Sequence, residues 1–210
     1  MRRVAVALEF LLLACMVMAQ VPGATPFSAD TSMKMKDGKN ITGKVYFGGG
    51  KMRQEMNMQG HEVIQIMDFQ RKVTDMLMPQ QKMYMEMPYG QMMQQHRGPK
   101  MPDLKAYDPN NPCAQSENMT CEKAGTETVN GRSTEKWIFH NKKDGSTMTT
   151  WIDTKLHYPI RMVNNEMQMD LTNVQEGMPA ASLFDVPPGY RKFDMGGMMG
   201  GHMPQNPNNE

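Results

Sequence analysis

Methionine recurs at every second position in several separate stretches of this chain. The longest series is Met83, Met85 and Met87, and the same spacing relates Met33 to Met35, Met56 to Met58, Met76 to Met78 and Met167 to Met169. Side chains two residues apart lie on one face of a β-strand, whereas an α-helix would turn them to different sides. The spacing therefore predicts strands that each present a methionine-rich face.

Methionine takes the place that leucine has in most globular proteins. The chain has 27 methionines and 9 leucines among its 210 residues. Val, Ile, Leu and Phe alone are too few for a folded core, but with methionine added they suffice for one domain of ordinary size. A single folded domain is expected.

The charges of the chain nearly cancel. There are 23 basic and 22 acidic residues, which leaves a formal net charge of +1. Binding to nucleic acid or to an anionic membrane surface usually needs a basic excess or patch. Nucleic acid is therefore excluded as an expected partner.

The N-terminus has the pattern of an export signal. Arg2 and Arg3 precede an apolar run at residues 4–19, which ends in Val17-Met18-Ala19 before Gln20. Residues 1–19 are predicted to be a cleaved signal peptide, since about 16 apolar residues are too few to span a bilayer. An alternative is that Leu12-Leu13-Ala14-Cys15 forms a lipobox, which would leave the protein anchored to the envelope through a lipid on Cys15.

Two cysteines remain after the signal. Cys113 and Cys121 form an even pair in an exported chain, so a disulfide between them is predicted. Their spacing does not fit a zinc knuckle, and no histidine lies between them.

Turn signals divide the rest of the chain into short alternating runs. Residues 27–87 are expected to form an antiparallel meander, with turns at Asp37-Gly38 and Gly48-Gly49-Gly50. Further strands are expected around 126–129, 135–140, 147–153, 160–163 and 166–174, with hairpins at Asn130-Gly131, Asp144-Gly145 and Asn164-Asn165. Residues 88–125, rich in proline, are expected to form a loop or short-helix lid, and residues 194–210 a disordered tail.

About ten strands with little helix predict a mainly β fold. The strand pattern alone leaves three architectures open, namely a sandwich, a closed barrel and a strongly curved open sheet.

Several short segments resemble the LolA/LolB-like superfamily. They are Gly43-Lys44-Val45-Tyr46, Lys51-Met52-Arg53, the strand change from Pro79 to Tyr84, Trp151-Ile152-Asp153 with Pro159, and Leu183-Phe184-Asp185-Val186-Pro187-Pro188-Gly189-Tyr190. The resemblance covers roughly residues 27 to 192. Within the superfamily, the chain is similar to uncharacterised, methionine-rich exported bacterial domains of unknown function.

The resemblance implies a LolA-like half-barrel, which is a curved antiparallel open sheet with a lid, at residues 20–193. It also implies a periplasmic protein that binds a lipid or lipoprotein acyl chain, as in the sorting of outer-membrane lipoproteins. No catalytic or ligand-binding residue of the superfamily is matched to a residue of this chain. A monomer is expected.

Four roles for the methionines stay open at this point. They could simply fill the core, or form an adaptable lining for an apolar ligand, bind Cu(I) through soft thioethers, or scavenge oxidants. The predicted ligand-lining residues are Met33, Met35, Met56, Met58, Met76, Met78, Met83, Met85, Met87, Met167 and Met169. The copper alternative adds the tail residues Met195, Met198, Met199, His202 and Met203.

No enzymatic motif is present in the sequence. It contains neither H-E-x-x-H nor G-x-S-x-G, and Gly48-Gly49-Gly50-Lys51 lacks the other residues of a phosphate-binding loop. His61, His140 and His157 are scattered singly. A binding protein without a cofactor is therefore predicted.

Overall fold

The structure is a computed structural model, and it describes residues 25–58, 60–88, 112–113 and 116–193. Several predictions lie outside these residues: the signal peptide at 1–19, the alternative anchor at Cys15, most of the lid and the tail at 194–210. They stay predictions.

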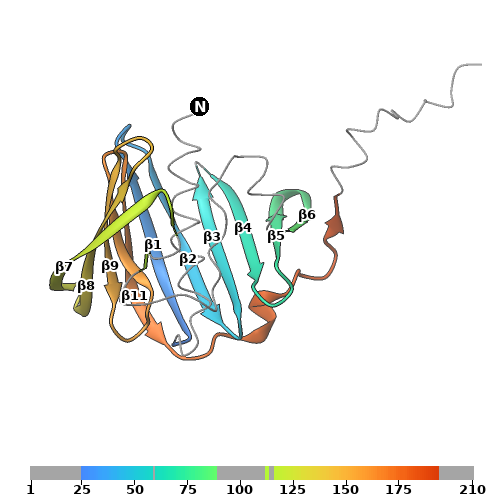
Figure 1. The fold of residues 1–210 in the computed structure, drawn as a ribbon. Coiled ribbons are helices and arrows are strands. Elements are labelled where there is room, and N and C mark those ends of the chain that lie inside the picture. Colours follow the sequence, from blue (N-terminus) through green and yellow to red (C-terminus); the bar gives the residue numbers. More distant parts are fainter. Residues whose placement is uncertain (1–24, 59, 89–111, 114–115, 194–210) are drawn as a thin grey trace, which may run out of the picture.

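The described residues form one sheet of 12 strands (Figure 1). Its strands are β1 (Phe27–Met35), β2 (Asn40–Gly48), β3 (Lys51–Met58), β4 (His61–Asp68), β5 (Val73–Met78), β6 (Met83–Pro88), β7 (Met119–Val129), β8 (Arg132–Asn141), β9 (Thr147–Asp153), β10 (Pro159–Val163), β11 (Met167–Glu176) and β12 (Arg191–Lys192). Two short 3₁₀ helices, η1 (Pro79–Gln81) and η3 (Ala181–Phe184), complete the described elements.

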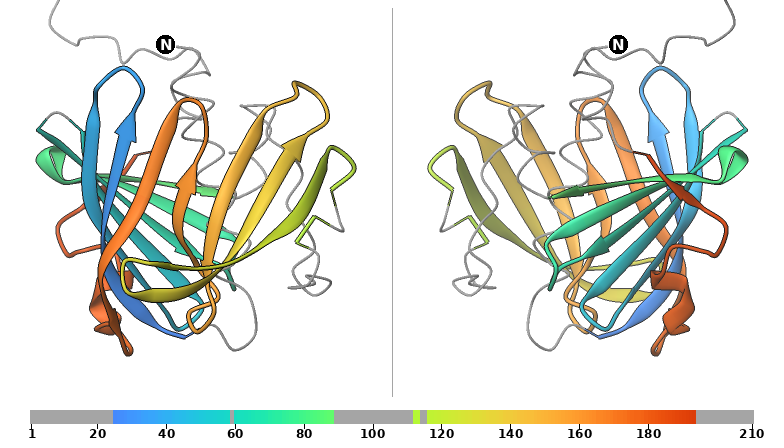
Figure 2. Two further views of the ribbon diagram at one scale, coloured as in Figure 1. Left: turned by 90° about the vertical axis from the view of Figure 1, so that its left-hand side faces the viewer. Right: turned by 90° about the vertical axis from the view of Figure 1, so that its right-hand side faces the viewer.

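The strand order is β12-β6-β5-β4-β3-β2-β1-β11-β10-β9-β8-β7. Strands β1 to β6 and β7 to β11 form two antiparallel meanders, which join where β1 pairs with β11. Figure 2 shows that the sheet is strongly curved, and the strand order leaves β7 and β12 as its two unpaired edges. The open, curved half-barrel predicted from the sequence is confirmed.

The turns follow from the residues that the sequence analysis identified. Asn130 and Gly131 both have positive φ, 51° and 78°, as a tight hairpin between β7 and β8 requires. Gly43 allows β2 to approach β3, because a Cβ atom at this position would lie 1.8 Å from the carbonyl oxygen of Glu55. Any other residue here would push the two strands apart.

One boundary differs from the prediction. Strand β7 begins at Met119, so residues 119–125 belong to the sheet and not to the expected lid. Most of β7 is exposed, and its register is shifted between Lys123 and Gly125. An exposed edge strand has few apolar residues, which explains why alternation did not reveal it.

The sheet has two hydrophobic clusters, one on each face. The smaller cluster joins Ile64, Ile66 and Leu77 to Phe184 of η3. Figure 2 shows the segment that contains η3, in red, against the outside of the curve, so this is the outer face. The larger cluster, which includes Phe27 and Met52, lies on the inner, concave face.

Candidate functional site

The strand register brings the methionines of the sheet onto the inner face. Residues directly paired on adjacent strands point to the same side. Met33 pairs with Met169, which pairs with Met162, and Met35 pairs with Met167. Within the β1–β6 meander Met52 pairs with Met67, Met76 with Met85 and Met78 with Met83.

This inner face contains every strand methionine whose side chain the structure describes. The set comprises Met33, Met35, Met52, Met56, Met67, Met76, Met78, Met83, Met85, Met87, Met119, Met148, Met162, Met167 and Met169. Met178 lies in the loop after β11 and is 65% exposed. We call the set the methionine face.

The methionine face has two parts that differ in burial. Met33, Met52, Met67, Met148, Met162, Met167 and Met169 are buried, and the Tyr158 hydroxyl donates to Met52 Sδ at 3.5 Å. Met35, Met56, Met76, Met78, Met83, Met85, Met87 and Met119 are half-buried. The buried part is core, and the half-buried part is the surface that a ligand could contact.

A small polar group interrupts the methionine face on β4 and β5. Gln65 is 2% exposed and is paired with Gln54 on one side and Met76 on the other. Thr74 is fully buried and is paired with Met67 and Met87. Neither Gln65 Nε2 nor Thr74 Oγ1 has a hydrogen-bond partner in the structure as described.

The outer face is covered in part by the chain that follows β11. Phe184, Val186 and Tyr190 pack with Ile64, Ile66, Leu77, Tyr46 and Tyr84. The buried Arg53 fixes η3, since its Nη1 donates to the Leu183 carbonyl at 3.0 Å and its Nε to Glu55 at 2.7 Å. Strand β12 then pairs in parallel with β6.

Two carboxylates on paired positions of the outer face have opposite pKa shifts. Burial, and then the neighbouring Glu86 charge, raise the pKa of Asp75. The hydrogen bond from Lys192 at 2.7 Å lowers the pKa of Glu86, and the bond from Arg71 at 2.8 Å acts in the same direction against the effect of burial. The ionised Glu86 therefore holds β12 at the sheet edge.

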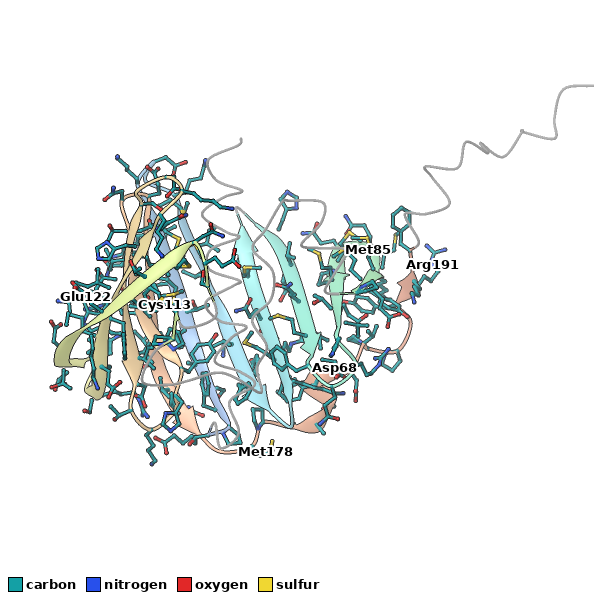
Figure 3. The ribbon with its side chains drawn as sticks, viewed as in Figure 1. Asp68, Met85, Cys113, Glu122, Met178 and Arg191 are labelled. Atoms are coloured by element: carbon teal, nitrogen blue, oxygen red, sulfur yellow. A yellow bond between two sulfur atoms is a disulfide. The ribbon has the colours of Figure 1, made fainter. Side chains whose placement is uncertain are left out.

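The predicted disulfide is present between Cys113 and Cys121, whose Cα atoms are 5.8 Å apart. Cys113 is buried, and Cys121 is paired with Phe139 of β8 and packs against the inner cluster. In Figure 3, Cys113 lies beside β7, at the same end of the sheet as Glu122 and at the opposite end from Met85 and Arg191. The bond therefore ties the segment before β7 to the inner face.

The structure brings together most of the predicted ligand-lining residues, all on the methionine face. The side chain of Met58 and the tail residues Met195, Met198, Met199, His202 and Met203 lie outside the described part. Sequence analysis did not select Met52, Met67, Met119, Met148 and Met162, which share this face. Met52 could have been found, because it continues the alternation of Met56 and Met58 in β3, whereas β4 is apolar on both faces around Met67.

His, Cys, Asp and Glu side chains do not gather in the described part of the chain. It contains no group of three or more His, Cys, Asp or Glu side chains that could hold a metal ion. His61 contacts Gln80 and His140 contacts Thr147, both at 3.3 Å. Among the described residues, no helix is long and apolar enough to cross a membrane.

Several solved bacterial structures are similar to this chain. An uncharacterised conserved protein from Thermus thermophilus has a TM-score of 0.55 and 12% identity, over 90% of this chain and 98% of that one. A structure of the MucA/MucB complex of Pseudomonas aeruginosa has a TM-score of 0.50 and 13% identity, over 84% of this chain and 60% of that one. A LolA superfamily protein from Nitrosomonas europaea gives 0.37 and 6%, over 82% and 97%.

The two likenesses with TM-scores of 0.55 and 0.50 concern the fold alone, an open and curved antiparallel sheet. None of the curated proteins matches the chain. The sequence does match one family over residues 29–157, described as Domain of unknown function (DUF4412). Because this match spans more than half of the chain, the protein belongs to the DUF4412 family.

Proposed function

We propose that this protein is an exported periplasmic binding protein that holds an apolar ligand, the acyl chain of a lipid or lipoprotein, against the methionine face. It would act as a carrier and not as an enzyme. The LolA-like fold supports this general role, and the methionine face provides a specific surface for it.

One observation carries the proposal: among the strand residues whose side chains the structure describes, methionine is restricted to one face of the sheet. Strands β4 and β5 place Ile64, Ile66 and Leu77 on the outer face but Met67, Met76 and Met78 on the inner face. A general bias in composition would put methionine in both clusters. The outer cluster has none among its described members.

The difference has a physical consequence for binding. Methionine is unbranched and flexible, so it fits irregular and varied apolar shapes, whereas Ile and Leu fix one packing arrangement. Surfaces that bind several partners use this property. A half-buried methionine surface therefore suits acyl chains that differ in length and bend.

The edges of the sheet support the expected monomer. Edge strands invite pairing with another chain unless they are charged, bulged or covered. Strand β7 carries Glu122, Lys123 and Glu127 and has a register shift, while β12 covers part of β6. Light scattering of the mature protein tests the monomer.

The binding test compares a charge placed on each face. Met85→Glu puts a carboxylate on the inner face beside Met76, and Thr42→Glu puts the same charge on the exposed outer side of β2. The delipidated mature protein is titrated with a fluorescent fatty-acyl ester. We expect Met85→Glu to weaken binding at least about tenfold because a charge in an apolar contact is costly. Equal effects of the two variants would contradict the proposal.

Cu(I) binding is the second candidate. Met76 pairs directly with Met85, and Met78 with Met83. Directly opposed residues on antiparallel strands have Cβ atoms about 4.5–5.5 Å apart. These four thioethers are thus close enough to share a soft ion. A competitive Cu(I) titration of the mature protein, with and without residues 195–210, measures this activity.

The location of the protein is tested on material from its own envelope. A mature N-terminus at Gln20 would agree with soluble export, and a diacylglycerol adduct on Cys15 with lipid anchoring. Native mass spectrometry of the same material would also reveal a co-purified lipid or copper ion.

A further inference from the structure

We propose that Gln65 and Thr74 form a polar anchor for the carbonyl oxygen of an esterified or amidated acyl chain. This inference rests on the proposed function and deepens it, because it specifies which kind of acyl compound the methionine face accepts. The two residues are nine apart in the sequence and come together only through the β4–β5 pairing.

Gln65 and Thr74 lie close together on the inner face of the sheet. Thr74 is paired with Met67, two residues from Gln65 on the same strand, so Gln65 and Thr74 occupy diagonal positions on the same face. Diagonal neighbours in an antiparallel pair are about 7–8 Å apart, within reach of one ligand group for a side chain as long as glutamine. The pair can therefore converge on a single oxygen atom.

Both side chains have hydrogen-bonding capacity that the described structure leaves unused. Gln65 is 2% exposed and Thr74 0%, yet Gln65 Nε2 and Thr74 Oγ1 have no partner in the described structure. Buried polar groups are normally hydrogen-bonded, so each exception requires an explanation. Around them stand Met67, Met76 and Met87, whose thioethers are only weak acceptors. Both groups can donate, and a ligand oxygen that entered between the half-buried side chains of Met76 and Met87 would satisfy them.

The charge of the surrounding side chains determines which form of an acyl group the anchor accepts. The inner positions of β3 to β6 include no lysine or arginine among the residues that the structure describes. A buried carboxylate without a cation is strongly unfavourable. The anchor therefore favours a neutral carbonyl, as in an ester or amide, over the ionised carboxylate of a free fatty acid.

The test uses three ligands of similar length: methyl decanoate, undecane and ionised decanoate. Each competes with the neutral fluorescent probe N-phenyl-1-naphthylamine for the delipidated mature protein at neutral pH. We expect the wild type to bind the ester about three- to tenfold more tightly than the alkane, the range that one or two neutral hydrogen bonds provide. The ionised acid should bind most weakly.

The variant that removes the anchor is Gln65→Met with Thr74→Val, which keeps side-chain volume nearly constant. We expect it to lose the preference for the ester and to have a higher Tm, because it no longer buries unpaired polar groups. A purely structural role would not produce both changes. The single variants, measured in the same way, guard against failure of the double variant to fold.

The matched control is Thr150→Val on β9. Thr150 is also buried with an unpartnered Oγ1, but six strands separate β9 from β5 in the sheet. It should raise Tm and leave the preference for the ester unchanged.

The possible failures are distinguishable. Equal binding of ester and alkane by the wild type, or an unchanged preference in the double variant, would overturn the anchor and leave the proposed function standing. If none of the three ligands displaced the probe from the wild type, the proposed function itself would be overturned.

Discussion

The two faces of this sheet are built by the same strands but from different apolar residues. On the outer face Ile64, Ile66 and Leu77 are closed over by Phe184, and Arg53 holds the covering segment in place. On the inner face seven buried methionines pack among branched and aromatic residues such as Phe27 and Trp137, and further methionines are half-buried at the surface of that face. Branched and aromatic residues have few rotamers and specify one packing, while methionine adapts. The covered outer face has no methionine among its described members, and the half-buried methionines of the inner face are the surface to which we assign binding in the proposed function.

The largest expected effect compares two neighbours on β5 that point to opposite faces. Leu77 is fully buried on the outer face and Met76 half-buried on the inner face. Leu77→Ala should lower the free energy of unfolding by about 2–5 kcal/mol, and Met76→Ala by under about 2 kcal/mol. Urea unfolding of the mature protein measures both. Equal losses would mean that the two faces contribute alike to stability.

The disulfide gives the next largest effect, and it acts on the inner face. Replacing Cys113 and Cys121 by serine should cost about 2–3 kcal/mol if the bond acts mainly by restricting the unfolded chain. Thiol labelling of the unreduced, denatured protein should find no free thiol in the mature wild type. Two labelled cysteines per chain would contradict the bond.

A smaller effect is expected when methionine on the inner face is exchanged for leucine. Replacing Met83, Met85 and Met87 by leucine keeps apolar volume nearly constant and should cost under about 1.5 kcal/mol per site. Binding of an apolar probe should persist. Any Cu(I) bound at the Met76–Met85 and Met78–Met83 pairs should be lost, because leucine has no lone pair to donate.

The same variant separates the two candidate functions. If the leucine variant lost probe binding but still bound Cu(I), both expectations for β6 would be wrong. Probe binding would depend on its methionines, and Cu(I) binding would not. A wild type that binds Cu(I) tightly through residues 195–210 and binds no apolar probe would replace the lipid hypothesis with the copper hypothesis.

The alternation of Met83, Met85 and Met87 was enough to predict their shared face, because a period of two does not depend on which strands become neighbours. The turn residues likewise predicted the hairpins, as at Asn130-Gly131. These features are local, which is why much of the sheet could be derived from the sequence.

Other features depend on pairing between distant segments and carried no local signal. Strand β12 has two residues and exists because Phe184 and Tyr190 dock on the outer face. The Gln65–Thr74 pair becomes visible only when the register of β4 against β5 is known. Such features are set by tertiary contacts, which override local propensity.

The smallest predicted effect concerns pH and acts on the outer face alone. The folded-state pKa of Asp75 is raised by burial, and next by the Glu86 charge, so the folded chain binds more protons than the unfolded chain between the two pKa values. The contribution of Asp75 to stability therefore falls as the pH rises through this window. Glu86 behaves oppositely, since its lowered pKa gives stability that is lost as the pH falls through the folded value.

Asp75→Asn should consequently stabilise the protein at pH 7, by on the order of 1 kcal/mol, because it removes a buried charge. The gain should shrink as the pH approaches the ordinary range of a carboxyl group. Glu86→Gln is the matched control on the paired position, and it should destabilise at pH 7 by releasing Lys192 and Arg71. Thermal unfolding at several pH values measures both variants. Neither should alter binding of an apolar probe, since both carboxylates lie on the side of the sheet opposite to the methionine face, and a shift in probe affinity would mean that the two faces are coupled.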